Sequence, residues 1–336
     1  MPSSKSIANI QALRAVAATL VIFQHILIVL LGSFGVDIFF VISGFVIAYV
    51  GTSERPDEFL LKRLFRIVPL YWLGTFAVLA IAGVAPSLLN STTANVTELI
   101  KSLFFIPYVK DNGLTHPLLF LGWTLNYEMF FYAIFAFALT FGARRAPVVA
   151  TAIIASLVLV GLLLPIETEP LRFWMRPIML EFLFGVWIFV GWQEGIKLQI
   201  DPRSALAIGA ALLVLMGWEE SRKSFDWIEP LSFGIPAATI VVLALACEGK
   251  LKVPVALLAI GDASYSLYLF HPYLVYPAQK IISHFTPNPL AIVLAIPFMV
   301  AASIALALAS YRIIERPTNI WLRATLMRPR AGAVVA

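Results

Sequence analysis

Apolar runs of about 20 residues recur along the whole of this 336-residue chain. A run of that length, in helical form, crosses the roughly 30 Å hydrocarbon core of a bilayer. The runs are continuously apolar, whereas the strands of a membrane barrel alternate over about ten residues. With 60% hydrophobic and 13% charged residues, the composition leaves no room for a separate soluble domain. The sequence therefore predicts an all-α, polytopic integral membrane protein.

We expect about ten membrane-spanning helices, separated by charged residues or by Pro and Gly. The predicted spans are residues 10–30, 34–51, 66–84, 118–142, 148–165, 171–192, 204–218, 229–247, 254–281 and 289–312. Most Lys and Arg residues outside these spans lie on the side of the N-terminus, so the positive-inside rule predicts that both termini are cytoplasmic. We expect one domain, residues 1–330, followed by a short tail, residues 331–336.

The basic residues behind the net charge of +5 are spread over short loops. This distribution favours membrane topology over nucleic-acid binding, so membrane lipids are expected as partners and nucleic acid is not. The sequence contains no HExxH motif, no Cys/His cluster and no other metal-ligand spacing, so no metal is expected.

Two ionisable residues, Arg14 and His25, lie within the first predicted span. Such side chains inside a bilayer cost at least about 2.5 to 3.5 kcal/mol each, so they persist mostly where they pair or function. Their separation, 25 − 14 = 11 residues, is about three helical turns and places them on one face roughly 16 Å apart. This helix is predicted to present a cation and a base to one interior channel.

The second span begins GVDIFFVISGF, directly after a turn at Gly32–Gly35. The midpoint of positions 25 and 37 falls in this turn, so Asp37 is predicted to lie at the membrane depth of His25. A carboxylate-to-imidazole hydrogen bond would fix the tautomer of the ring and raise its basicity. A buried polar pair that only closes the hairpin is an equally good interpretation.

Basic residues precede the third span in FLLKRLFRIVPLYW, where Arg63 and Arg66 are i, i+3 neighbours beside Lys62. Paired guanidinium groups bind phosphate bidentately, as the phosphates of an acyl carrier require. Ordinary positive-inside anchoring is the alternative, and by itself this motif favours anchoring.

The fourth span contains WTLNYEMFFY and places Glu128 near the middle of the membrane. A carboxylate there needs a partner. Tyr132 lies one helical turn further on and Asn126 lies nearby, while Arg14 and His25 are the opposite charges that the first span offers. A catalytic carboxylate and a structural ion pair are both compatible with this position.

In the ninth span Gly261, Ser264, Tyr268 and His271 fall at i, i+3, i+7 and i+10, which predicts one polar stripe. His271 is expected near the depth of His25, so the stripe is a candidate lining for the same cavity. Hydrogen bonding between helices is the alternative. Tryptophans such as Trp123 near span ends fit an interfacial belt, although an aromatic face also suits a carbohydrate.

Taken in order, these motifs and the closing YRIIERP resemble the bacterial acyltransferase-3 family, nearest to its exopolysaccharide-modifying branch. The resemblance covers nearly the whole chain. It implies a multi-pass enzyme of the bacterial cytoplasmic (inner) membrane that moves an acyl group, usually acetyl from acetyl-CoA, to a hydroxyl group. The implied acceptor is a carbohydrate or lipid-linked saccharide outside the cytoplasm.

The family's functional residues map onto this chain by motif. The family's arginine and histidine on the first helix correspond to Arg14 and His25. Its basic motif before the third helix corresponds to Arg63 and Arg66, and its Trp–Glu motif to Trp123 and Glu128. We predict a catalytic group consisting of His25, Asp37 and Glu128, in which His25 is the general base. Acyl-CoA is expected to bind Arg14, Arg63 and Arg66. The substrate is expected to contact Trp123, Tyr268 and His271.

Two questions stay open at the level of sequence. The acyl group either moves directly to the acceptor or passes through an acyl-histidine. A rival class is a transporter or flippase of a lipid-linked sugar or small solute, in which the intramembrane charges would couple or gate transport. Many transporters have repeated halves with broken helices, and the sequence shows neither clearly.

Overall fold

A computed structural model describes residues 7–27, 32–84, 95–110, 113–222, 228–286 and 288–327. Every regular element in these ranges is helical, as the all-α prediction requires. The elements are α1 (Ala8–Leu27), α2 (Gly35–Gly51), α3 (Pro56–Val84), α4 (Val96–Leu103), α5 (Gly122–Leu139), α6 (Ala146–Leu163), α7 (Leu171–Trp174), η2 (Pro177–Met179), α8 (Leu180–Gln193), α9 (Pro202–Ser221), η3 (Pro230–Gly234), α10 (Ile235–Ala246), α11 (Val255–Asp262), α12 (Ser264–Phe270), α13 (Pro272–Phe285), α14 (Pro289–Ser310), η4 (Tyr311–Glu315) and α15 (Arg316–Leu326).

Four helical stretches in the described ranges are long and apolar enough to cross a membrane, namely Pro56–Val84, Ala146–Leu163, Pro202–Ser221 and Leu290–Leu326. Three shorter apolar stretches are Gly35–Gly51, Pro177–Gln193 and Pro230–Ala246. These helices support a multi-pass membrane protein. The count of about ten spans and the cytoplasmic position of the termini stay predictions, and the tail 331–336 lies outside the described residues.

The helices follow several predicted spans closely but not all. Helix α3 begins ten residues before the predicted span 66–84 (66 − 56 = 10), so its basic motif lies within the helix. The predicted span 171–192 is divided into α7, η2 and α8, and the span 254–281 into α11, α12 and α13. Two of these breaks have a simple cause, because Pro177 and Pro272 have no N–H to continue the helical hydrogen-bond ladder.

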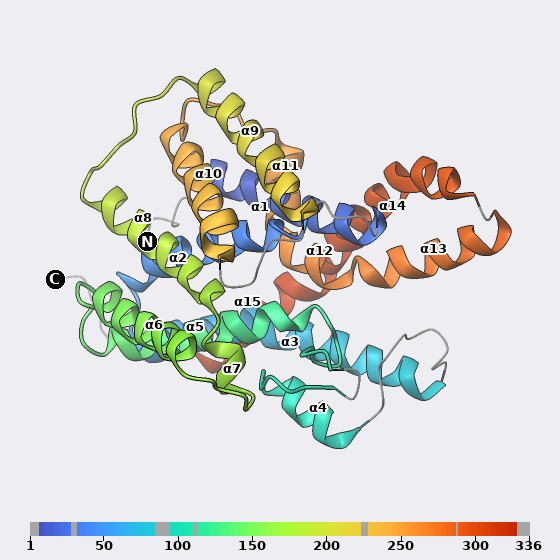
Figure 1. Cartoon of the computed structure of the whole chain (residues 1–336), viewed down its shortest axis with the longest axis horizontal. Helices are drawn as coiled ribbons and strands as arrows, with labels where there is room; N and C mark the ends of the chain where they lie inside the picture. The colour runs from blue at the N-terminus through green and yellow to red at the C-terminus, as the bar shows by residue number, and fades with distance from the viewer. Residues whose placement is uncertain are drawn as a thin grey trace.

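Helix α1 lies at the centre of the fold, where it packs against α2, α10, α11, α12, α13 and α14. Figure 1 shows α13 and α14 extending together at one end of the molecule, and α4 beside α3 at the periphery. Glu248 holds the first turn of α1, since its carboxylate accepts hydrogen bonds from the backbone N–H groups of Ala8 and Asn9, both at 2.9 Å. These donors have no partner within the helix itself.

Helices α2 and α8 run parallel at very short range. A Cβ atom on Gly44 would lie 1.9 Å from the carbonyl oxygen of Phe182, and one on Gly185 would lie 2.0 Å from that of Val41. Only glycine permits such an approach of two backbones. The contact fixes the rotation of α2 about its own axis, and therefore the direction in which each of its polar side chains points.

Candidate active site

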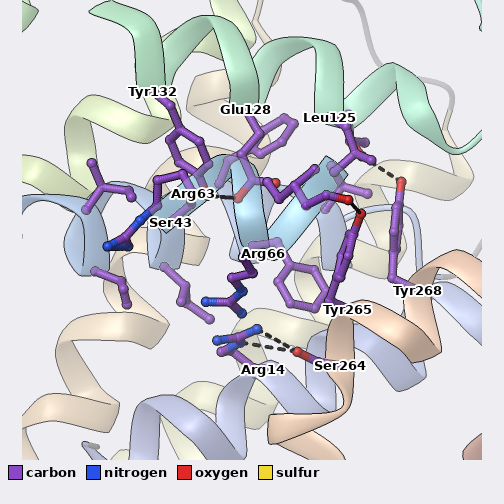
Figure 2. Close-up of a pocket in the computed structure, with 18 residues that line it drawn as sticks. Arg14, Ser43, Arg63, Arg66, Leu125, Glu128, Tyr132, Ser264, Tyr265 and Tyr268 are labelled. Atoms are coloured by element: carbon purple, nitrogen blue, oxygen red, sulfur yellow. Dashed lines mark hydrogen bonds between the residues drawn. The ribbon is translucent and has the colours of Figure 1, made fainter. Parts of the chain in front are cut away.

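A narrow cavity of about 90 Å³ lies where α1, α2, α3, α5 and α12 meet. We call it the arginine cavity. Its polar lining residues are Arg14, Ser43, Arg63, Arg66, Thr124, Glu128, Tyr132, Ser264, Tyr265 and Tyr268 (Figure 2). The cavity thus collects side chains from sequence motifs that lie more than 200 residues apart.

Arg14 and Arg66 face each other across this cavity (Figure 2). Arg14 donates hydrogen bonds from Nε and Nη2 to Ser264 Oγ at 3.2 and 2.9 Å. Within the described ranges, neither arginine forms an ion pair with a carboxylate. Two guanidinium groups placed together repel each other, so the arrangement is suited to an anion that binds both.

Arg63 differs from Arg66 although the two are one turn apart. Arg63 is 8% exposed, and its Nη2 donates a hydrogen bond to Glu54 Oε2 at 3.0 Å. Lys62 binds the other oxygen of the same carboxylate at 2.9 Å. Glu54 therefore already balances the charge of Arg63, whereas the guanidinium of Arg66 faces the cavity. Arg323 of α15, which the sequence analysis did not single out, lies near enough to interact electrostatically with both arginines.

Glu128 is held in the cavity wall by two hydroxyl groups. Ser43 Oγ donates a hydrogen bond to Glu128 Oε1 at 3.1 Å, and the hydroxyl of Tyr132 donates to the same oxygen. The ion pair to Arg14 or His25 that the sequence suggested is not formed within the described ranges. Ser43 was missed, although its place in the second span next to Gly44 marks it as a polar group inside an apolar run.

His25 and His271 form a direct contact, which we call the histidine pair. His25 Nδ1 and His271 Nε2 are 3.2 Å apart, and the ring centroids are 4.9 Å apart. Each Nδ1 also meets a backbone carbonyl oxygen of its own helix, Val21 O at 2.8 Å for His25 and Leu267 O at 3.0 Å for His271. The structure thus brings together two histidines that depth alone had placed at one level.

Tyr268 separates the histidine pair from the arginine cavity. It lines the cavity, and its ring centroid is 6.5 Å from that of His271. Its hydroxyl is hydrogen-bonded with Thr124 Oγ1 at 2.8 Å, which fixes the ring in this position. The ring of His25 also contacts Phe120 and Tyr276, whose ring centroids are 5.6 and 6.1 Å from that of the imidazole. The cavity and the histidine pair are therefore adjacent but distinct.

Asp37 does not have the partner that the sequence analysis predicted. Its carboxyl group is buried against that of Glu181 in the first turn of α8, while the hydrogen bonds of the His25 ring go to Val21 and His271. The prediction used membrane depth, which leaves rotation about the helix axis undetermined. The close packing of α2 on α8 sets this rotation and turns Asp37 toward Glu181.

The remaining candidates lie farther from the cavity. Trp123 is half-buried, with its ring centroid 6.1 Å from that of Tyr127, and it is not among the residues that line the arginine cavity. Another cleft, of about 480 Å³, lies beside the end of α6 and α7 and is lined in part by Glu169, Arg172 and Arg176. In the described part of the chain no three His, Cys, Asp or Glu side chains gather as a metal site requires.

Comparison with known proteins gives a consistent result. The model of a family described as an acyltransferase domain, acyltransferase-3, matches residues 7–308. The chain is 34% identical to the exopolysaccharide production protein ExoZ of Rhizobium meliloti (strain 1021), over 91% of this chain and 93% of that protein. It is 27% identical to the O-acetyltransferase OatA of Staphylococcus aureus (strain NCTC 8325 / PS 47), over 94% of this chain but only 58% of OatA. No solved structure matches the chain.

Proposed function

Because the chain belongs to the acyltransferase-3 family, we propose that it transfers an acyl group, in its simplest form acetyl, from acyl-CoA to a hydroxyl group of an exported polysaccharide. The acceptor class follows from the names of the two relatives, one concerned with exopolysaccharide production and the other an O-acetyltransferase. The proposed location is the bacterial cytoplasmic membrane, with the arginine cavity toward the cytoplasm and the histidine pair toward the outside.

The observation that carries the donor assignment is the facing pair of Arg14 and Arg66. Both guanidinium groups are without a carboxylate ion pair in the described part of the chain, and Arg66 makes no hydrogen bond there. An anion relieves their repulsion and accepts several hydrogen bonds, and the phosphates of CoA have this chemistry. Arg63 and Arg323 add positive potential at the same end of α3, although Glu54 partly offsets it.

The chemical step assigns His25 as general base. As the acceptor oxygen attacks the thioester carbon, its proton passes to His25, the carbon–sulfur bond breaks, and the thiolate leaves. The proton then returns from His25 to the thiolate, so the products are the ester and free CoA. A positioned base of this kind contributes about 10² to 10⁴ in rate.

The other predicted site residues take supporting roles in this proposal. Glu128 limits the net positive charge of the cavity, since it lines the same cavity as Arg66. Tyr268 stands between donor and acceptor and shapes the path of the acyl group. Asp37 acts through the packing of α2 on α8 rather than on His25. Trp123, which lies on α5 beside Tyr127, is kept as a candidate contact for the acceptor.

A transfer assay tests the proposal in membrane vesicles containing the full chain. The vesicles receive acetyl-CoA radiolabelled in the acetyl group and exopolysaccharide from which mild alkali has removed the esters. We expect label in alkali-labile esters of the polysaccharide with wild type. His284→Ala is the matched control for His25→Ala, because His284 is exposed. Absence of label from the polysaccharide with wild type would refute the function, as would movement of saccharide across the vesicle membrane without any acyl donor.

A further inference from the structure

The backbone dictates where the hydrogens of the histidine pair lie. His271 Nδ1 is 3.0 Å from Leu267 O, and a carbonyl oxygen only accepts, so Nδ1 of His271 carries a hydrogen. His271 is 1% exposed, and a buried imidazolium without a counter-ion is costly, so the ring is neutral. A neutral imidazole has one donor nitrogen and one acceptor nitrogen. Nε2 of His271 therefore presents a lone pair.

The same reasoning fixes the tautomer of His25. Its Nδ1 lies 2.8 Å from Val21 O and 3.2 Å from Nε2 of His271, and both of these atoms are acceptors. Nδ1 of His25 consequently carries the hydrogen and shares it between the two. The lone pair of His25 is then on Nε2, the nitrogen that takes no part in these contacts.

We propose that His271 is the positioning residue of His25, holding the ring so that Nε2 is the basic atom and stabilising the imidazolium that forms when Nε2 takes a proton. A charged N–H donor makes a stronger hydrogen bond than a neutral one, so the contact to His271 strengthens as His25 is protonated. A neutral acceptor achieves this without the desolvation cost of a buried carboxylate. The catalytic consequence rests on the proposed function, whereas the tautomers do not.

The surrounding helix keeps this contact in register. His271 lies at the junction of α12 and α13, and Gln279 on α13 donates hydrogen bonds to Ile26 O at 2.6 Å and to His25 O at 3.2 Å. These carbonyls lie in the last turn of α1, and the carbonyls of a last turn have no partner within the helix. Gln279 of α13 thus holds the main chain of His25, and His271 at the start of α13 holds its ring.

The alternative role for His271 is purely structural, as a buried side chain that satisfies Leu267 O. Two substitutions separate the roles, because each amide side chain retains one of the two hydrogen bonds of the imidazole and loses the other. In His271→Asn the amide nitrogen takes the place of Nδ1 and keeps the bond to Leu267 O, but the side chain is too short to reach His25. In His271→Gln the amide oxygen takes the place of Nε2 and accepts from His25 Nδ1.

The kinetic test measures acetyl transfer in the vesicle assay. If His271 positions His25, kcat falls roughly tenfold to a hundredfold in His271→Asn and is largely restored in His271→Gln, while KM for acetyl-CoA is unchanged in both. A structural role predicts the reverse order, with Asn retaining kcat and Gln losing it, and that result would overturn the proposal.

A second measurement does not depend on activity. The chain contains only four histidines, so nitrogen NMR of the full protein in bilayers, with isotope-labelled histidine, resolves each ring. We expect His25 and His271 both as the Nδ1–H tautomer in wild type, with His25 losing this preference in His271→Asn and keeping it in His271→Gln. Detection of either ring as the Nε2–H tautomer in wild type would disprove the inference. If the tautomers are as stated but no acetyl is transferred, the proposed function is refuted while the assignment of the hydrogen bond between His25 and His271 is retained.

Discussion

The arginine cavity and the histidine pair are neighbours, yet they are built in opposite ways. The cavity is lined by five helices and holds two arginines without carboxylate ion pairs in the described ranges, so an anionic ligand can still pair with both of them. The histidine pair comes from α1 and the α12–α13 junction, and backbone carbonyls already satisfy both Nδ1 atoms. An unsatisfied charged site is suited to binding, whereas a satisfied neutral site is suited to holding one reactive atom in place.

If the two regions divide the work in this way, substitutions in the histidine pair should change kcat and substitutions in the cavity should change KM. We expect the largest effect from His25→Ala, which removes the base. Its kcat should fall by about 10² to 10⁴, while KM for acetyl-CoA changes little. The vesicle assay measures both, with His284→Ala as control. A rise in KM at unchanged kcat would instead show that His25 binds the donor, and the proposed division of work between the two regions would be wrong.

The next effect should come from Arg66→Gln in the cavity. The loss of charge-assisted hydrogen bonds worth about 1.5 to 3 kcal/mol raises KM for acetyl-CoA roughly tenfold to a hundredfold, with kcat nearly unchanged. S-acetyl-pantetheine, which has no phosphate, provides the sharper comparison. Wild type should prefer acetyl-CoA strongly and Arg66→Gln should not. The exposed Arg55, paired with Asp57, gives the control Arg55→Gln. An equal preference in the variant and wild type would exclude Arg66 from phosphate binding.

A smaller effect is expected from Ser43→Ala, which removes one of the two hydroxyl donors to Glu128. A single hydrogen bond is worth about 0.5 to 1.5 kcal/mol, so transfer should fall only about twofold to tenfold. The double variant Ser43→Ala/Tyr132→Phe removes both hydroxyl donors, so Glu128 then has no donor in the described part of the wall. Its loss of activity should exceed the combined losses of the two single variants. Ser53→Ala at the exposed end of α2 is the control. Additive effects would show that the two hydroxyls act independently.

The smallest effect is expected at Asp37, where the partner predicted from the sequence (His25) differs from the one in the structure (Glu181). Since its carboxyl group lies against Glu181, Asp37→Asn should leave the His25 tautomer unchanged in the NMR experiment. Asp57→Asn on the exposed start of α3 is the matched control. A change of the His25 tautomer in Asp37→Asn, but not in the control, would support the hydrogen bond between Asp37 and His25 that the sequence predicted.

Much of the fold could be predicted because long apolar runs become helices in a bilayer-like environment, and α2, α5, α6 and α14 follow their runs within a few residues. The breaks could not be predicted from proline alone. Pro69 and Pro297 lie inside continuous helices, whereas Pro177 and Pro272 stand where helices begin. Whether a lost backbone hydrogen bond ends a helix depends on what the neighbouring helices offer in its place, which is a tertiary property.

The sequence by itself determined the helical class, the family and the ionisable residues buried among apolar ones, since hydropathy and motif order are local. It also placed His25 and His271 at one depth. Only the tertiary structure decided the partners: His271 rather than Asp37 for His25, and Ser43 with Tyr132 rather than Arg14 for Glu128. The physical reason is that residue spacing fixes position along a helix axis, whereas the rotation of each helix is set by how closely it packs, as Gly44 and Gly185 show for α2 and α8.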